Sequence, residues 1–238
     1  MEMPTPSDAL APDQEEHVSS FRGIPNDAVE FFRELRLDNS KAWWELNKQR
    51  YAASVRDPLA HLLDGLADEF GEASLFRPYR DVRFSADKSP YKEHQGALIG
   101  TAGGMGWYLQ IGPEGLMTGA GFYAQAPDQI ARYRSAVDTP ASGTQLDAIV
   151  TTLRENGIEI GGDQLKTKPR GFTADHPRLE LLRHKSLTAT RAHGVPDWMS
   201  TPAVLDHVRV EFASMRPLVG WLTANVGGTL APTRGSRP

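Results

Sequence analysis

The stretch RPYRDVRFSADKSPYK, residues 77–92, places three arginines, two lysines and two aspartates within sixteen residues. A guanidinium group forms paired hydrogen bonds with a carboxylate or a phosphate, so this excess of cations favours an anion-binding site. Arginines beside aspartates also form structural ion-pair networks, and the residue types alone leave both interpretations open. The predicted ligand-binding residues of this stretch are Arg77, Arg80, Arg83, Lys88, Tyr91 and Lys92.

Two aspartates in the same stretch are candidate catalytic residues. Asp81 and Asp87 could move a proton, or could only orient the neighbouring arginines. Residues 77–94, here called the first basic segment, contain five basic and three acidic side chains, a net charge of +2. The whole chain has a formal net charge of −4, so this segment is locally cationic in an acidic protein.

A second basic segment, residues 166–185, contains six basic and two acidic side chains, a net charge of +4. Lys168 and Arg170 surround a turn and are predicted to bind the same anion. His176, which follows Asp175, is the third candidate catalytic residue, although a histidine beside a proline more often makes only local hydrogen bonds. We predict that both segments converge on one partly exposed anion site.

Several classes of site are excluded or unsupported by composition. The chain has no cysteine, which excludes disulfides, thiol catalysis, iron–sulfur clusters and cysteine-bound zinc. Its seven histidines show no pair at metal-ligand spacing, so no metal site is predicted and any cofactor is unknown. The net charge of −4 argues against a protein that coats nucleic acid nonspecifically.

Hydrophobic spacing predicts helices, then strands, then helices. Apolar residues follow a helical period over 25–70, and residues 96–123 form short runs separated by glycines, which is typical of antiparallel strands. Helical patterns return at 127–157 and 202–226, with short strands expected near 164–167 and at 186–192. This order predicts a single α+β domain over residues 21–226 with a mostly antiparallel sheet.

Both ends of the chain are polar or rich in proline and glycine. Residues 1–20 are predicted to be a disordered arm and residues 227–238 a flexible tail. No apolar run reaches the length of a membrane helix, and the first twenty residues lack a basic start and an apolar stretch. We therefore expect no membrane contact and a cytoplasmic protein, with the oligomeric state unknown.

The motif residues together resemble the family called domain of unknown function 2461. Its pattern, R-x-x-R-D-x-R-F followed by an acidic residue, a lysine and a tyrosine, matches Arg77, Arg80-Asp81, Arg83-Phe84, Asp87-Lys88 and Tyr91. The stretches FFRELRLDNSKAWWELNKQRY and PRGFTADHPRLELLRHKSLT are also similar to the family, and the resemblance spans about residues 21–226. Asp38-Asn39 and Trp43-Trp44 depart from the usual Asn-Asn and Trp-Phe pairs. The resemblance implies one domain and a set of polar positions, but no activity.

Two functional hypotheses from different classes remain. The first is a protein, with enzymatic activity uncertain, that binds a small molecule or nucleotide bearing phosphate or carboxylate. The second is a non-enzymatic module for nucleic acid, which is not favoured, or for an acidic protein, with the Arg/Asp motif as a structural network. Salt dependence separates them, because a phosphate-backbone binder loses affinity steeply as salt rises.

Overall fold

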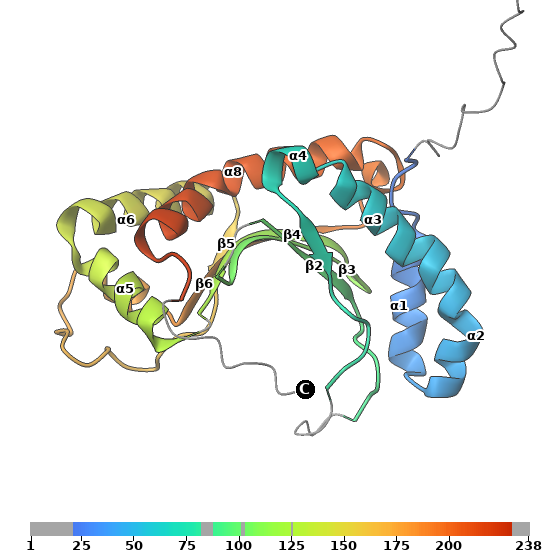
Figure 1. Cartoon of the computed structure of the whole chain (residues 1–238), viewed down its shortest axis with the longest axis horizontal. Helices are drawn as coiled ribbons and strands as arrows, with labels where there is room; N and C mark the ends of the chain where they lie inside the picture. Colours follow the sequence, from blue (N-terminus) through green and yellow to red (C-terminus); the bar gives the residue numbers. More distant parts are fainter. Residues whose placement is uncertain (1–20, 82–87, 101–102, 125, 230–238) are drawn as a thin grey trace, which may run out of the picture.

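A computed structural model describes residues 21–81, 88–100, 103–124 and 126–229. The described residues form the predicted α+β domain, with one six-stranded antiparallel sheet in the strand order β1-β2-β3-β4-β6-β5. Figure 1 shows a curved sheet with α4 and α8 crossing its convex side, α1 and α2 at one end, and α5 and α6 at the other. None of the described helices is long and apolar enough to cross a bilayer.

The N-terminal helices follow the predicted apolar stripe, and Ser40 caps the second helix by accepting a hydrogen bond from the Trp43 amide at 3.1 Å. Asp57-Pro58 is a sequence typical of a helix start, and a helix does begin at Asp57, but a π-helical turn joins it to the preceding helix without a loop. Gly71, with φ of +95°, ends this region in a conformation that favours glycine. The elements are α1 (Asp27–Leu37), α2 (Lys41–Tyr51), η1 (Ala52–Arg56), α3 (Asp57–Asp64) and α4 (Ala67–Phe70).

The central strands alternate between a face that packs against helices and a face that does not. On β3, Trp107, Leu109 and Ile111 are buried, and the Trp107 indole donates to the Phe212 carbonyl of α8 at 3.0 Å. The turn between β3 and β4 contains Gly115 with φ of +103°, where an added Cβ would lie 1.9 Å from the Gly194 carbonyl oxygen. The strands are β1 (Ala73–Leu75), β2 (Gln95–Ile99), β3 (Met105–Gly112), β4 (Gly115–Tyr123), β5 (Glu159–Gly161) and β6 (Ser186–Gly194).

The C-terminal half supplies the second helical layer. Val208, Phe212, Met215 and Leu222 of the longest helix are fully buried, as the apolar stripe predicted. This helix contains Pro217 and contacts β3 and β4. The elements are α5 (Pro127–Asp138), α6 (Pro140–Glu155), α7 (Leu179–Leu182), η2 (Asp197–Ser200) and α8 (Val204–Asn225).

One predicted strand is wrong in position. The strand expected near 164–167 is β5 at Glu159–Gly161, and Gln164 forms only an isolated bridge with His184. The reason is that β5 pairs with Thr188–Thr190 of β6, which places the polar residues after Gly161 beyond the ladder. The alternation of residue types in VRFS, residues 82–85, also favours a strand, but these residues lie outside the described part of the chain.

The first residues of the predicted C-terminal tail contact α5. Gln129 donates to the Gly227 carbonyl at 2.9 Å, and Thr229 donates to Asp128 at 2.8 Å. These contacts concern only residues 227–229. The flexibility predicted for both ends of the chain stays a prediction, because residues 1–20 and 230–238 lie outside the described part.

Candidate functional site

Residues 78–80 and 90–92, here called the motif arms, form an antiparallel pair that continues the sheet beyond β1 and β2. Tyr79 and Tyr91 form an isolated antiparallel bridge. The Arg80 amide donates to the Pro90 carbonyl at 2.9 Å, and the Lys92 amide donates to the Pro78 carbonyl at 2.8 Å. Backbone hydrogen bonds therefore pair the two ends of the motif with each other, as in a β-hairpin.

Asn39, between α1 and α2, fastens one arm of this pair to the helical layer. Its side-chain amide donates to the Tyr91 carbonyl at 3.0 Å, and its side-chain oxygen accepts from the Tyr91 amide at 3.1 Å. An Asn side chain has both a donor and an acceptor, so it satisfies both backbone groups of one residue as a neighbouring strand would. These two hydrogen bonds connect the turn between α1 and α2 to the motif arm that contains Tyr91.

Aromatic stacking also holds the arm that contains Tyr91 against α2. The Tyr91 ring is only 4% exposed and stacks on Trp44, with centroids 4.2 Å apart and an angle of 9° between the planes. Tyr79 packs on both rings, with its centroid 5.4 Å from that of Tyr91 and 6.3 Å from that of Trp44. Tyr91, which was predicted to bind ligand, is therefore placed to hold the segment in position.

A buried polar network fixes the point where the arms meet β2. The Tyr51 hydroxyl donates to the Gln95 side-chain oxygen at 2.6 Å, and burial raises the pKa of Tyr51 to about 12, so the hydroxyl stays protonated. The Gln95 amide donates to the Phe76 carbonyl at 2.8 Å and to the Gly96 carbonyl at 2.9 Å. The backbone before Arg77 is thereby held by side chains that are themselves buried.

An open hollow of about 880 Å³ borders these arms and is here called the motif hollow. Ser74 and Leu75 of β1 line one part of it. The remaining described residues that line it are Phe76, Arg77, Tyr79, Arg80, Asp81 and Lys92. Three cations and one carboxylate therefore meet at the surface, beside two aromatic rings.

The local field of the motif hollow is positive. In the described part of the chain, neither Arg77 nor Lys92 forms an ion pair, and the Lys92 ammonium lies 5.4 Å from the centroid of the Phe76 ring. Burial, followed by the charges of Lys92 and Arg80, lowers the pKa of His94. Nearby positive charges lower the pKa of an imidazole because they disfavour its protonated, cationic form.

The second basic segment does not join this site. It follows β5, which is the opposite edge of the sheet from β1, so about five inter-strand spacings, on the order of 24 Å along the sheet, separate them. The predicted convergence of Lys168 and Arg170 with Arg77 and Arg80 is therefore wrong. Strand order decided this, because β2, β3, β4 and β6 lie between β1 and β5.

Cations of the second segment bind backbone carbonyls. Lys168 donates to the Phe172 carbonyl at 2.8 Å, and Arg183 donates to the Leu165 carbonyl at 2.8 Å. Arg178 donates to the carbonyls of Val137 and Asp138, at 2.7 and 3.0 Å, at the end of α5. This is the stabilising role of a cation at a helix C-terminus.

His176 has local partners on both ring nitrogens. Its Nδ1 accepts from the Arg178 amide at 3.1 Å, and its Nε2 lies 3.1 Å from an Asp138 oxygen. The neighbouring Asp175 accepts instead from the Thr173 hydroxyl, which lowers the pKa of the Asp175 carboxyl. His176 lies with the second segment and cannot share a site with Asp81, so the three candidate catalytic residues do not form one centre.

Some predicted site residues lie outside the motif hollow or outside the described chain. Lys88 is exposed next to the arms, and Arg170 is exposed at the opposite edge. Arg83 and Asp87 lie outside the described residues. Within the described ranges, no group of three or more histidine, aspartate or glutamate side chains could hold a metal ion.

Phe76 and Tyr79 are site residues that sequence reasoning missed. Both have large exposed fractions, 37% and 59%, and both alternate with cations in the run Phe76-Arg77-Pro78-Tyr79-Arg80. That interleaving of aromatic and basic residues was visible in the sequence. Their exposure was not, because it depends on Trp44 and Tyr91 filling the space beneath.

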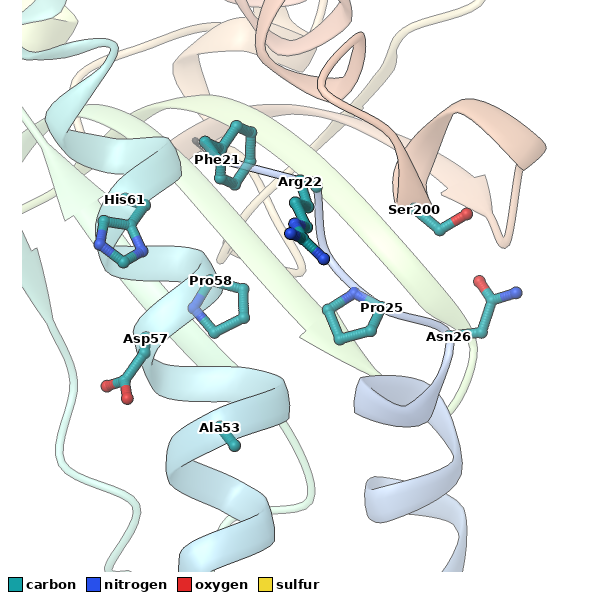
Figure 2. A pocket seen from close by; sticks show the side chains of 10 residues that line it. Phe21, Arg22, Pro25, Asn26, Ala53, Asp57, Pro58, His61 and Ser200 are labelled. Atoms are coloured by element: carbon teal, nitrogen blue, oxygen red, sulfur yellow. The ribbon is translucent and has the colours of Figure 1, made fainter. Parts of the chain in front are cut away.

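A separate hollow of about 490 Å³ lies between the start of the described chain and α3 (Figure 2). Figure 2 shows Arg22 and Asn26 on one side and Asp57 and His61 on α3. Gly23 closes the wall with φ of +99°, and an added Cβ there would lie 2.5 Å from the Thr201 backbone nitrogen. This hollow mixes one carboxylate with one guanidinium and contains none of the motif residues, so the motif hollow is the stronger candidate.

Comparison with known proteins gives a family but no activity. A family model described as "Conserved hypothetical protein (DUF2461)" matches residues 27–221. No curated protein and no solved structure was found to match the chain. The matched range contains α1, the Asn39 clamp, both motif arms and most of α8. Because the match covers most of the sequence, this protein belongs to the DUF2461 family of conserved hypothetical proteins.

Proposed function

We propose that the protein binds a small molecule or nucleotide bearing phosphate or carboxylate in the motif hollow. One observation carries the proposal: Arg77, Arg80 and Lys92 surround a hollow of about 880 Å³ that contains only one carboxylate among its described lining residues, Asp81. Arg77 and Lys92 form no ion pair with any described residue, and guanidinium and ammonium groups at a surface bind anions. The volume is within the range of about 300–1,000 Å³ for ligand sites.

The backbone of the site is preorganised. Asn39 and the Trp44–Tyr91 stack hold the arm that contains Lys92, and Gln95 holds the backbone next to Arg77. A ligand that enters such a site orders few new backbone groups, which reduces the entropic cost of binding. Asp81 lines the same hollow and is the candidate for proton exchange with a bound ligand, and the proposal covers binding alone.

Calorimetric titration at low salt tests the proposal. Inorganic phosphate, pyrophosphate, citrate and a nucleoside triphosphate are titrated into the full chain and into Arg77→Gln and Lys92→Gln. Binding of at least one anion is expected, and each substitution should weaken it about tenfold, because a hydrogen bond to a charged group contributes about 1.5–3 kcal/mol. Lys185→Gln, which removes an exposed cation of the second segment, is the matched control. Equal affinity in all variants would reject this site.

The alternative is a non-enzymatic module for nucleic acid or an acidic protein. One observation favours it: the motif hollow is open and includes exposed aromatic rings, whereas a dedicated small-molecule site encloses most of its ligand. The affinity of a polyanion should fall with salt in proportion to the number of phosphates contacted, and that of a small anion should fall much less.

A further inference from the structure

A second hollow borders the segment that follows β1. It has a volume of about 580 Å³ and is here called the helix hollow, because Lys48 of α2 and Arg56 of η1 line it. Leu75, Phe76, Arg77 and Tyr79 line both this hollow and the motif hollow. Segment 75–79 therefore borders both hollows and is here called the ridge.

Cations line both depressions and the ridge between them. Arg80 and Lys92 lie on the motif side, Arg77 lies on the ridge, and Lys48 and Arg56 lie on the helix side. The carboxylates among the described lining residues are Asp81 on one side and Glu45 on the other. Five basic side chains against two acidic ones form a cationic track in a chain whose net charge is −4.

The ion pairs of the helix hollow are of the kind that an anion can replace. Lys48 lies 2.7 Å from Glu45, and Arg56 lies 2.7 Å from Asp57. All four side chains are about half exposed or more. Exposed pairs of this kind contribute at most about 1 kcal/mol, so a phosphate group can compete for either cation.

Aromatic rings stand on the ridge between the cations. Phe76 and Tyr79 are 37% and 59% exposed, although each is packed from one side. Tyr79 lies on Tyr91 and Trp44, and the Phe76 centroid lies 6.2 Å from that of Tyr108. Rings fixed in this way provide flat surfaces on which a planar group can stack without the protein losing much side-chain entropy.

We propose that the two hollows together also bind a single-stranded nucleic acid, whose backbone crosses the ridge and whose bases stack on Phe76 and Tyr79. The inference rests on the proposed function for phosphate recognition in the motif hollow and extends it into the helix hollow. A cationic groove interleaved with exposed aromatic rings is the arrangement that binds single strands, because unpaired bases have accessible faces. A duplex hides those faces, and the carboxylates of an acidic peptide provide charge but no planar ring beside each charge.

Fluorescence anisotropy with labelled dT12 and U12 oligonucleotides tests the extension. Binding is expected with a slope of log affinity against log salt of about −3.5, since each of five phosphate contacts on a single strand contributes about −0.7. The double variant Lys48→Gln/Arg56→Gln should reduce the magnitude of that slope by about 1.4. The control Lys41→Gln/Lys185→Gln removes two exposed cations that line neither hollow and should leave the slope unchanged.

Aromatic variants separate stacking from charge. Tyr79→Leu and Phe76→Leu should each weaken dT12 binding about tenfold, whereas Tyr79→Phe, which keeps the ring, should bind like the parent. Tyr123→Leu is the control, because Tyr123 is 64% exposed and lines neither hollow. The melting temperature of each variant shows whether the fold is intact, and Tyr79→Phe provides the comparison if Tyr79→Leu is unstable.

The outcomes distinguish the extension from the site on which it rests. If phosphate and pyrophosphate bind through Arg77 and Lys92 but dT12 and U12 bind no more tightly, the extension is wrong and the small-anion site stands. If poly-glutamate competes as well as dT12 and the aromatic variants bind normally, the partner is an acidic protein and the nucleic acid is rejected. If neither phosphate nor any oligonucleotide binds, both proposals fail.

Discussion

The two basic segments use positive charge in different ways. In the first, Arg77 and Lys92 line an open hollow and form no ion pair with any described residue. In the second, which has the larger net charge, Arg178 and Arg183 donate hydrogen bonds to backbone carbonyls at 2.7–3.0 Å. The carbonyls bound by Arg178 are those at the C-terminus of α5. A count of charges therefore ranks the two segments in the wrong order as candidate sites.

The difference arises from what lies beneath each segment. Asn39 and the Trp44–Tyr91 stack satisfy the backbone of the first segment, so its cationic side chains are not needed to hold it. In the second segment, the basic side chains themselves donate to backbone carbonyls, as Lys168 does to Phe172 and Arg178 does to Val137. A cation becomes available for a ligand where other groups stabilise the chain around it.

The largest expected effect is the loss of the aromatic support under the first segment. Trp44→Ala should lower the free energy of unfolding by about 3–5 kcal/mol, because it deletes a buried indole and leaves a cavity. Trp44 is 4% exposed, whereas Trp43 is only partly buried, so Trp43→Ala is the matched control and should cost less. Urea denaturation measures both. Equal losses would show that the stack on Tyr91 has no special role.

The next effect concerns the carbonyl contacts of the second segment. Arg178→Ala should cost about 1–2 kcal/mol of stability, because the Val137 and Asp138 carbonyls lose their donors. Arg77→Ala, a change of the same size in the first segment, should cost less than about 0.5 kcal/mol, as is usual for an exposed surface residue. A stability loss for Arg77→Ala as large as that for Arg178→Ala would make the motif arginine structural.

A smaller effect is expected in the pKa values of two histidines. Burial lowers the pKa of both His94 and His184, and the charges of Lys92 and Arg80 lower that of His94 further. A bound phosphate offsets these charges, so the pKa of His94 should rise while that of His184 stays constant. Proton NMR titration of the imidazole signals, with and without phosphate, measures this. A His184 that moves with His94 would reveal a general salt effect.

The smallest expected effect is that of a lysine in the second segment. Lys168→Ala should change neither stability, by more than about 0.5 kcal/mol, nor anion affinity, because this exposed side chain binds only the Phe172 carbonyl at 2.8 Å. Lys92→Ala is the comparison and should weaken anion binding. Calorimetry and thermal melting give both quantities. If Lys168→Ala weakened binding as much as Lys92→Ala, the two segments would have to act on one ligand after all.

Much of the fold could be predicted from local patterns. The apolar stripe of α8, the cap at Ser40 and the strands between glycines in β2 to β4 all depend on residues a few positions apart. The position of β5 could not be predicted in this way, since Glu159–Gly161 forms a strand only because β6 pairs with it. The continuity of α2 with α3 through η1 was missed for a related reason: Pro58 suggests a helix start, but it is also tolerated in a first turn that follows another helix.

The candidate site was predictable only in part. Arg77, Arg80, Asp81 and Lys92 were selected by residue type, and they do line one hollow. The roles of Asn39 and Phe76 were not evident, because an Asn that clamps a distant backbone and an exposed ring have no short-range signature. The contacts that matter, such as Asn39 with Tyr91, join positions that are 52 residues apart.

The sequence by itself determined the family, the α+β class and the excess of cations over carboxylates in two segments, because these properties depend on residue types and short spacings. Only the tertiary structure decided which of the two segments faces a hollow. Strand order is set by pairing between residues far apart in the chain, and loop closure costs too little free energy for the spacing along the sequence to specify it. The four strands between β1 and β5 therefore separate two segments that charge alone would have joined.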